Sequence, residues 1–316
     1  MDDRGLSASV EATVKAREAK TKAGIYELRA VCQDFRLQLL GGMVGALALW
    51  EACILPSLLN NCGTWISINE ATIKKLDRLQ NMCVLALLKM PQSTPQLSTR
   101  AMTGQLGMRH RIWKEKLNLV AAIKKLEENT LAKEVFNDQL KLGLPGLVQE
   151  AQDISEKIGI QDISRNEVTK EEINEALETH HLKTMREEMG DKTKYQIMKN
   201  EDTRKMQKFL EEMNLEECCV AMRVKCYMID CAGNMCAKYR GREECLKCTP
   251  RQGREGPGML ETQEHLEVCA GYERFRTERD LSNFKDKVEY FKDVVKEREE
   301  MIKRIRRAKM KNKKSK

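Results

Sequence analysis

The sequence has few aromatic residues and few prolines. Phenylalanine, tyrosine and tryptophan make up 5% of its 316 residues, and only six prolines interrupt the chain. The alternation of apolar and polar residues that is typical of strands rarely extends beyond a few positions. A third of the residues are charged and 41% are apolar, which is enough for a real core. The composition therefore argues against a sheet protein and predicts a mostly α fold in two or three domains.

Motifs that indicate common catalytic sites are also lacking. The sequence contains no Walker phosphate loop, no H-E-x-x-H motif and no G-x-S-x-G nucleophile elbow. We therefore expect no enzymatic activity of these kinds and no small-molecule substrate. The sequence also shows no secretory signal peptide, so we expect the twelve cysteines to be reduced and the protein to be intracellular, in the nucleus or the cytoplasm.

An uncharged run long enough to cross a membrane is missing as well. Between Leu37 and Asn69 the single charged side chain is Glu51, and the uncharged run before it has 14 residues. A bilayer crossing needs roughly 20 residues. The segment is also broken by Gly41, Gly42, Gly45 and Pro56. We expect a buried core helix over about 45–60 and no association with a membrane.

Two pairs of metal-ligand residues form the most specific pattern in the chain. They follow the spacing C-x2-C-x16-H-x3-C, with Cys245, Cys248, His265 and Cys269. Such pairs can converge on one tetrahedral Zn²⁺, and a site with four protein ligands is typically structural. If 262–272 is helical, His265 and Cys269 share one face. The alternative is four reduced side chains that are near one another by chance. The other cysteines of this region have no such spacing and are interpreted as packing thiols: Cys218, Cys219, Cys226, Cys231 and Cys236.

Apolar residues at spacings of three and four predict amphipathic helices on both sides of the uncharged segment. The clearest stripes are Ile25, Leu28, Cys32, Phe35 and Leu39, and Ile73, Leu76, Leu79, Cys83, Leu87 and Met90. Two capping boxes, Ser67 with Glu70 and Thr169 with Glu172, predict helix starts. The expected organisation is a helical bundle over 1–141, a glycine-containing linker over 142–168, a helical C-terminal domain over 169–280 that includes the zinc module 245–269, and a terminal helix with a basic tail over 281–316.

Positive charge is concentrated near the C-terminal end. Residues 1–269 contain 39 basic and 39 acidic side chains, whereas 270–316 contain 17 and nine, which accounts for the net charge of +8. The tail cluster includes Arg304, Arg306 and Arg307. The cluster fits a nuclear localisation signal, an arm that binds nucleic acid or a solubilising tail, and composition alone does not distinguish these three roles.

A second basic surface is predicted on the helix over 109–126. Its polar side contains Arg109, Arg111 and Lys114. These residues fit a surface that faces phosphates, because lysine and arginine release counterions when they neutralise a polyanion. An ordinary solvated helix face is the more usual interpretation of such a run of charges.

Several short motifs occur in an order known from one protein family. The first group is Asp34-Phe35-Arg36 followed by Gly41-Gly42, Ile54-Leu55-Pro56-Ser57-Leu58-Leu59-Asn60-Asn61, Thr64-Trp65, Leu76 to Gln80, Leu88-Lys89-Met90-Pro91, Ser93-Thr94-Pro95 and Gly104-Gln105-Leu106-Gly107. The second is Thr262-Gln263-Glu264-His265-Leu266 leading to Cys269, with Asn234 and Tyr239 upstream. Together, over about 6–276, they resemble the region just after the palm in reverse transcriptases of non-LTR, LINE-type retrotransposons.

The resemblance implies that 1–141 is a helical thumb, which in polymerases grips the primer–template duplex, and that the zinc motif belongs to a C-terminal domain that helps to bind the element's RNA. It implies contacts to the nucleic-acid backbone from Arg17, Lys20, Arg29 and Arg36. Trp65 is expected in the core rather than as a stacking platform. The expected partner is retroelement RNA or an RNA/DNA duplex, and the absent palm and fingers are a second candidate partner.

The sequence departs from this family where the chemistry takes place. Polymerases hold two metal ions with aspartates of the palm, and here Asp2-Asp3 is the single Asp-Asp pair, without a preceding strand or an earlier aspartate. We therefore expect a non-catalytic remnant that binds nucleic acid. The alternatives are a zinc-stabilised module for protein–protein interaction with 281–305 as the partner helix, an aggregation-prone pseudogene product, and a truncated form of an active RNA-directed DNA polymerase.

Overall fold

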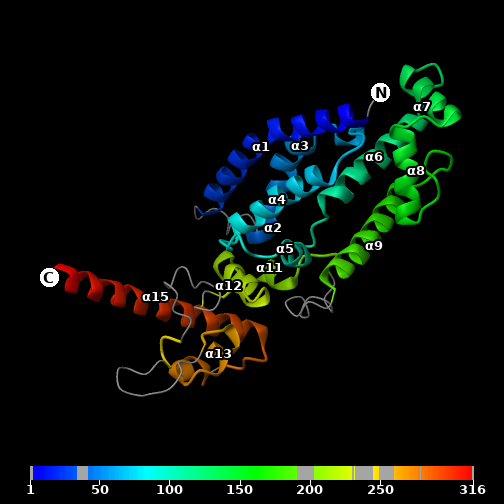
Figure 1. Cartoon of the computed structure of the whole chain (residues 1–316). Coiled ribbons are helices and arrows are strands. Elements are labelled where there is room, and N and C mark those ends of the chain that lie inside the picture. The colour runs from blue at the N-terminus through cyan, green and yellow to red at the C-terminus, as the bar shows by residue number, and fades with distance from the viewer. Residues whose placement is uncertain are drawn as a thin grey trace. The chain divides into compact units, whose positions relative to one another are not determined.

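The computed structural model (Figure 1) describes residues 3–33, 42–190, 203–229, 231, 245–248, 260–277 and 279–314. Over these residues the regular elements are all helical, which confirms the prediction of a mostly α protein. The chain divides into two compact units. Unit 1 comprises Met1–Leu87 and Pro95–Glu211, and unit 2 comprises Leu88–Thr94 and Glu212–Lys316.

Unit 1 begins with the long helix α1, Asp3–Gln33, which packs along α4, Glu70–Leu87. Both helices bury the stripes that their spacing predicts. On α1, Ile25, Leu28 and Cys32 are buried, and on α4 the buried set includes Ile73, Leu76, Leu79, Cys83 and Leu87. The remaining residues predicted for the first stripe, Phe35 and Leu39, lie outside the described residues, as does Arg36.

The apolar segment after α1 is helical but changes its pitch at its centre. It consists of α2, Gly42–Leu49, the π-helical turn η2, Trp50–Ile54, and α3, Leu55–Leu59. Pro56 has no N–H for the carbonyl four residues earlier, and the N–H of Leu55 bonds to the Trp50 carbonyl in an i→i−5 pattern. A proline near the start of α3 therefore accompanies a wider turn rather than a break.

This segment is buried on one face, so the expectation of a helix buried all round is only partly correct. Trp50 and Leu58 are buried, whereas Val44 is 43% exposed and Cys53 is exposed. The stretch Gly42–Thr64 is long and apolar enough to span a bilayer by length and composition alone, and 33% of its most apolar window is buried. Its buried face packs against α1.

Of the two predicted capping boxes, one is wrong and one is confirmed. The N-terminus of α4 is capped by Asn69, whose Oδ1 accepts the N–H of Thr72 at 2.8 Å. Ser67 has a φ of 55°, and its N–H donates to Glu150 Oε1 at 2.6 Å, so it is engaged by another helix. Thr169 behaves as predicted, because its side chain accepts the Glu172 N–H while Glu172 accepts the Thr169 N–H.

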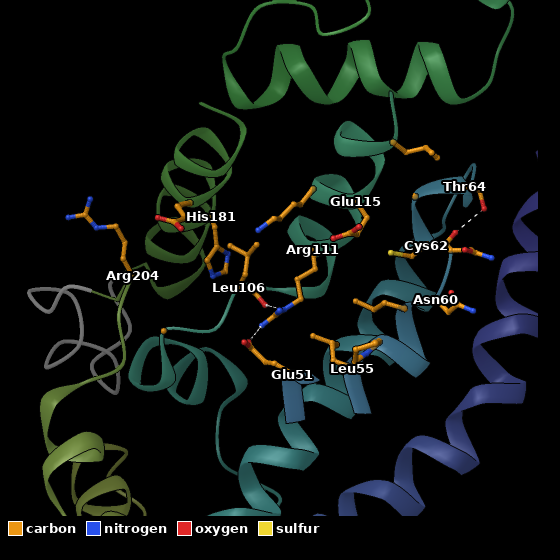
Figure 2. A pocket seen from close by; sticks show the side chains of 18 of the residues that line it. Glu51, Leu55, Asn60, Cys62, Thr64, Leu106, Arg111, Glu115, His181 and Arg204 are labelled. Atoms are coloured by element: carbon orange, nitrogen blue, oxygen red, sulfur yellow. Dashed lines mark hydrogen bonds and ion pairs between the residues drawn. The ribbon is translucent and has the colours of Figure 1, made fainter. Parts of the chain in front are cut away.

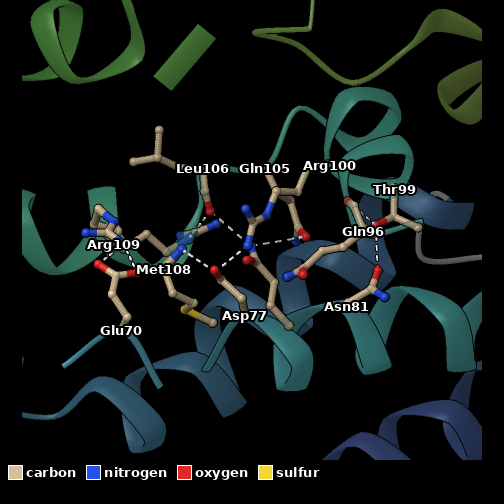
Figure 3. Close-up of polar contacts among 12 residues, drawn as sticks. Glu70, Asp77, Asn81, Gln96, Thr99, Arg100, Gln105, Leu106, Met108 and Arg109 are labelled. Carbon is tan, nitrogen blue, oxygen red and sulfur yellow. Dashed lines mark hydrogen bonds and ion pairs between the residues drawn. The ribbon is translucent and has the colours of Figure 1, made fainter. Parts of the chain in front are cut away.

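After α4, unit 1 continues with the helices α5 to α9. Their bounds are Gln96–Thr103 for α5, Met108–Lys124 for α6, Leu131–Leu142 for α7, Leu147–Ile158 for α8 and Lys170–Met189 for α9. A side chain of α4 binds the first residue of α6 (Figure 3). Asp77 of α4 accepts the N–H of Met108 of α6 at 3.0 Å and also pairs with Arg100 of α5.

The predicted linker over 142–168 is wrong. It contains α8, whose residues Val148, Ala151 and Ile154 belong to one apolar cluster with residues of α6 and α9. Gly143 and Gly159 have φ values of 61° and 76° and end α7 and α8, so these glycines are helix C-caps rather than signs of a flexible connection. The predicted boundaries at 141 and 168 also disappear, because unit 1 continues to Glu211.

A buried ion pair attaches α8 to the rest of unit 1. Lys116 of α6 is 2% exposed, and its Nζ contacts Glu150 Oε2 and donates to the Trp65 carbonyl at 2.6 Å. The same carboxylate receives the Ser67 N–H. One lysine and one glutamate thus connect α6, α8 and the loop before α4.

We expect Lys116→Met to lower the free energy of unfolding of unit 1 by about 3 kcal/mol, because it leaves the Trp65 carbonyl and a half-buried carboxylate without their cation. Urea unfolding followed by far-UV circular dichroism measures this change. Lys125→Met, at an exposed lysine just beyond the end of α6, is the matched control and should change the value by less than about 0.5 kcal/mol. Equal losses in the two variants would contradict this role of the pair.

The last described helix of unit 1 is α11, Lys208–Glu212, at the boundary with unit 2.

Unit 2 is smaller than unit 1. The described helical elements of unit 2 are α12, Leu215–Lys225, α13, Gln263–Val268, the 3-10 turn η5, Ala270–Tyr272, α14, Glu273–Arg276, and α15, Phe284–Lys314. The core of unit 2 contains Val224, Ile229, Cys231, Cys245, Leu266, Cys269, Tyr272, Tyr290, Phe291 and Val294. The predicted separate segment 281–316 is therefore wrong for its first half, which forms part of this core.

Candidate metal centre and basic surface

The first pair of predicted ligands lies in a turn that the structure describes from Cys245 to Cys248. Cys245 is fully buried and Cys248 is half-buried. The N–H of Leu246, between them, donates to Glu261 Oε2 at 3.1 Å. The turn is thereby attached to the chain that enters α13.

The second pair brackets the end of α13. Thr262 caps this helix, since its side chain accepts the N–H of His265 at 3.1 Å. The helix ends at Val268, and Cys269 is extended, with φ −65° and ψ 121°. The prediction that His265 and Cys269 share a face of one continuous helix over 262–272 is therefore wrong in detail, although the two side chains converge.

The four side chains meet in one cluster. Their ligand atoms all lie within 4.8 Å of one another. Cys245 Sγ is 3.8 Å from Cys269 Sγ, and Cys248 Sγ is 3.2 Å from Cys269 Sγ. Thiolates bound about 2.3 Å from a tetrahedral zinc ion are about 3.8 Å apart, so one of these distances matches and the other is short.

An imidazole nitrogen of His265 has no hydrogen-bond partner among the described residues. His265 Nε2 is buried and makes no hydrogen bond to any residue that the structure describes. Buried polar atoms normally have a partner, and a nitrogen of this kind beside three sulfur atoms is suited to a metal ion. The residues therefore fit a four-coordinate, structural metal site.

The three thiols of the cluster hold their protons unless a cation displaces them. Burial raises the pKa of the Cys245, Cys248 and Cys269 thiols above the ordinary value. In the metal-free site these groups are therefore neutral near pH 7, and a metal ion binds by replacing their protons. Three sulfurs and one imidazole are a donor set typical of Zn²⁺.

The remaining cysteines that the structure describes here are not among the four clustered ligand residues. Cys231 is part of the apolar core of unit 2, and Cys218 and Cys226 are buried in the same unit, in agreement with their interpretation as packing thiols. Burial raises the pKa of Cys218 to about 12, which makes it a poor nucleophile. Cys236 lies outside the described residues.

Arg17, predicted to contact a nucleic-acid backbone, has a structural role instead. Its Nη1 donates to the carbonyls of Leu58 and Asn60 at 3.1 and 2.8 Å, at the C-terminal end of α3. The guanidinium also lies over the ring of Trp65, 5.7 Å from its centroid. Trp65 is buried, as predicted for a core residue. These contacts use Nη1 alone, so a phosphate contact from Arg17 would use the N–H groups of Nε or Nη2.

Two arginines of the predicted basic face of α6 also have partners within the protein. Arg109 forms a bidentate pair with Glu70, at 2.6 and 2.5 Å (Figure 3). Arg111 pairs with Glu51 at 2.7 Å and donates to the Leu106 carbonyl (Figure 2). Both arginines are therefore engaged by carboxylates distant in the sequence, and their contact with phosphate stays a prediction.

Other predicted contact residues remain accessible. Lys20 is exposed on α1, and Arg29 and Lys114 are partly exposed, without an ion-pair partner among the described residues. On α15 the side chain of Arg304 is 80% exposed and lies 3.9 Å from Glu300, and Arg307 is exposed. The backbone of Arg306 is helical. The accessible predicted cations are thus on α1, at Lys114 and on the last helix.

A cavity of about 720 Å³ lies in unit 1 among α3, α6 and α9 (Figure 2). Its charged lining residues are of both signs: Glu51, Arg111, Lys114, Glu115, Glu178 and Arg204. Arg111 is already paired with Glu51 across it. The mixture gives the cavity no dominant charge that would select an anion.

A cluster of histidines was not foreseen from the sequence. His180 and His181 are adjacent on α9, yet both rings approach His110 of α6, with His110 Nε2 3.0 Å from His180 Nδ1 and the ring centroids of His110 and His181 4.8 Å apart. Burial lowers the pKa of His110 to about 3 and that of His181 to about 4. No sequence signal connects residues 70 positions apart, so spacing alone could not have revealed this contact.

Comparisons of the chain with protein-family models, with curated proteins and with solved structures found no match.

Proposed function

We propose that this protein is a non-catalytic, zinc-stabilised nucleic-acid-binding protein. The observation that carries the proposal is the convergence of Cys245, Cys248, His265 and Cys269 in the core of a unit that also contains the basic helix α15. In this proposal zinc is bound by these four residues and has a structural role, because all four positions of a tetrahedral ion are filled by the protein. The nucleic acid is bound mainly through its phosphates.

The proposed binding surface is the end of α15. After Arg298 the helix continues for more than four turns, and its residues include Lys303, Arg304, Arg306, Arg307, Lys309, Lys311, Lys313 and Lys314. We call residues 299–314 the basic arm. A helix with this density of positive charge attracts a polyanion over several ångströms, and the attraction weakens with salt. Lys20, Arg29 and Lys114 are the remaining candidates in unit 1.

The resemblance of the sequence to the thumb and C-terminal region of LINE-type reverse transcriptases supports a retroelement origin. In this proposal the partner is retroelement RNA or an RNA/DNA duplex, and a palm and fingers region is a second partner. An intracellular location, in the nucleus or cytoplasm, fits such a partner. The proposal includes no role for a membrane or a small-molecule substrate.

The packing of α15 bears on the alternative that residues 281–305 are a helix for binding another protein. Tyr290, Phe291 and Val294 are buried in the core of unit 2, and Leu281 and Phe284 pack against the same core. The apolar face needed to bind a partner helix is therefore already covered over these residues. This observation favours nucleic acid over a helical protein as the ligand of α15.

A salt titration of binding to a fluorescent RNA/DNA duplex tests the proposal. The logarithm of the affinity should fall linearly with the logarithm of the salt concentration, with a slope of several units. Arg304→Ala/Arg307→Ala should weaken binding and reduce the slope by about 2, because each arginine removed releases about one counterion fewer.

The matched control is Lys125→Ala/Lys141→Ala, which removes two exposed cations of unit 1 that are not proposed contacts. This variant should bind with nearly the slope of the unchanged protein. A slope near zero for the unchanged protein, or absence of binding at low salt, would contradict the proposed function.

A further inference from the structure

A fully buried carboxylate lies between the two pairs of metal-ligand residues. Glu261 is 0% exposed. Its Oε2 accepts the N–H of Leu246 in the turn of the first pair, at 3.1 Å. Along the chain Glu261 immediately precedes Thr262, which caps the helix that carries His265. One side chain is therefore attached to both halves of the metal site.

The other oxygen of this carboxylate faces α15. Glu261 Oε1 accepts a hydrogen bond from Arg298 Nη2, and the side chain of Arg298 is 1% exposed. Charges removed from water to this extent are tolerated when they are paired and hydrogen-bonded. The pair therefore ties the position of the metal-ligand turn to the position of Arg298 on α15.

Apolar contacts reinforce this connection. Tyr290, Phe291 and Val294 of α15 lie in the same buried cluster as Cys245 and Cys269. Tyr290 also donates from its hydroxyl to the carbonyl of Leu266, at 2.5 Å, between the two ligands of the second pair. The surface of α15 that precedes the basic arm is thus one wall of the metal site.

The docking of α15 and the ordering of the ligands depend on the same contacts. Glu261 bonds both to the turn of the first ligand pair and to Arg298. Tyr290 bonds to the carbonyl of Leu266, between the ligands of the second pair. A metal ion that fixes the ligands therefore also fixes the groups to which α15 is bonded, so zinc binding and the docking of α15 should favour each other.

We propose that Glu261 and Arg298 are positioning residues of the metal centre, which make α15 part of that centre and couple zinc occupancy to the docking of the helix that carries the basic arm. This inference rests on the proposed zinc site. It adds to that site a second layer, which includes Arg298, 29 residues beyond the nearest ligand, Cys269, in the sequence.

Glu261→Gln tests the positioning role. The amide keeps an oxygen for the Leu246 N–H but loses the charge that faces Arg298. We expect the affinity for Zn²⁺, measured by competition with a chromogenic chelator, to fall 10- to 100-fold, as is typical when a partner of a metal ligand is lost. Co²⁺ substitution should still give absorption bands typical of three thiolates and one imidazole, because the ligands themselves are unchanged.

A neighbouring ion pair provides the matched control. Lys247, in the same turn, pairs with Glu297 of α15 at 2.7 Å, but both side chains are partly exposed. Glu297→Gln should change zinc affinity less than threefold, because solvent replaces much of the lost interaction. Equal losses of affinity in Glu261→Gln and Glu297→Gln would overturn the inference, since the effect would then not depend on the buried pair.

Amide hydrogen exchange measures the coupling between zinc occupancy and the docking of α15. In the unchanged protein, removing zinc with a chelator should raise amide hydrogen exchange over residues 284–298 at least tenfold, and in Glu261→Gln the protection of this segment should be reduced even at saturating zinc. If α15 exchanges equally with and without zinc in the unchanged protein, the coupling is absent and the inference fails.

A second variant covers the case in which Glu261→Gln does not fold. Glu261→Gln/Arg298→Met removes both charges, and replacing a buried pair by uncharged residues often preserves folding. This variant should still bind zinc at least tenfold more weakly than the unchanged protein, and affinity equal to that of the unchanged protein would overturn the inference. Absence of zinc from the unchanged protein would instead overturn the proposed function itself.

Discussion

Removal of zinc is expected to unfold unit 2 and to leave unit 1 folded. Two of the proposed ligands, Cys245 and Cys269, lie inside the apolar core of unit 2, so this core is assembled around the metal site. Binding of a structural zinc ion stabilises small folds by on the order of 10 kcal/mol at neutral pH, which exceeds the stability expected of a core of this size. The core of unit 1 lies in other helices and contains none of these ligands.

The measurement is limited proteolysis combined with far-UV circular dichroism, with and without a strong chelator. With chelator, cleavage should occur throughout 212–316, and a fragment that ends near Glu211 should survive. Cys245→Ser should reproduce this pattern without chelator. Cys53→Ser, at an exposed cysteine of unit 1 that is remote from the cluster in sequence, is the control and should leave metal content and helicity unchanged. Full protection of 260–314 in metal-free protein would show that zinc does not stabilise this unit.

Acid is expected to destabilise unit 1 well before most carboxylates are protonated. Burial holds the pKa of His110 at about 3 and that of His181 at about 4, both below the ordinary value near 6.5. Arg100 and Arg109 add to the effect by disfavouring a further positive charge. The unfolded chain binds these two protons more readily than the folded chain does. The stability that the neutral histidines contribute is therefore present in full above pH 6.5 and is lost as the pH falls towards 4.

The expected loss between pH 7 and pH 4 is on the order of 5 kcal/mol, if both histidines remain neutral in the folded state. Urea unfolding at a series of pH values measures it, followed by hydrogen exchange over the helices of unit 1, because acid also displaces zinc from unit 2. His110→Gln cannot titrate and should lower the slope of stability against pH by about half. Since slopes are compared rather than absolute stabilities, a destabilised variant still gives an answer. An unchanged slope would mean that His110 does not stay neutral in the fold.

The helix starts show where local patterns suffice and where they fail. Thr169 and Glu172 form the predicted capping box because both partners of each bond lie within four residues of one another. Ser67 has an equally good sequence pattern, but Glu150, 83 residues later, receives its N–H, and Asn69 becomes the cap. A capping pattern therefore predicts a start reliably only if no distant group competes for the same N–H.

The stretch over 142–168 shows a second kind of failure. Its glycines and weak periodicity predicted a linker. Gly143 and Gly159 instead end the helices α7 and α8, and α8 buries Val148, Ala151 and Ile154. Val148, Ala151 and Ile154 are three residues apart and lie on one face of α8, so the helical period is present in the sequence and was missed because the glycines on either side indicated a loop. The helix is held by packing against α6 and α9 and by the pair between Lys116 and Glu150, which no local pattern contains.

The sequence by itself determined the helical class, the buried stripes of α1 and α4 and the four residues of the metal cluster. Each of these follows from residues a few positions apart, because helix periodicity and ligand spacing act over one or two turns. Only the tertiary structure decided which cations are free and which are occupied, as for Arg17 on α3 carbonyls and Arg109 on Glu70. It alone placed His110 beside His180 and Glu261 against Arg298, because burial and ion pairing depend on which helices pack together, and that is set by the whole core rather than by any one segment.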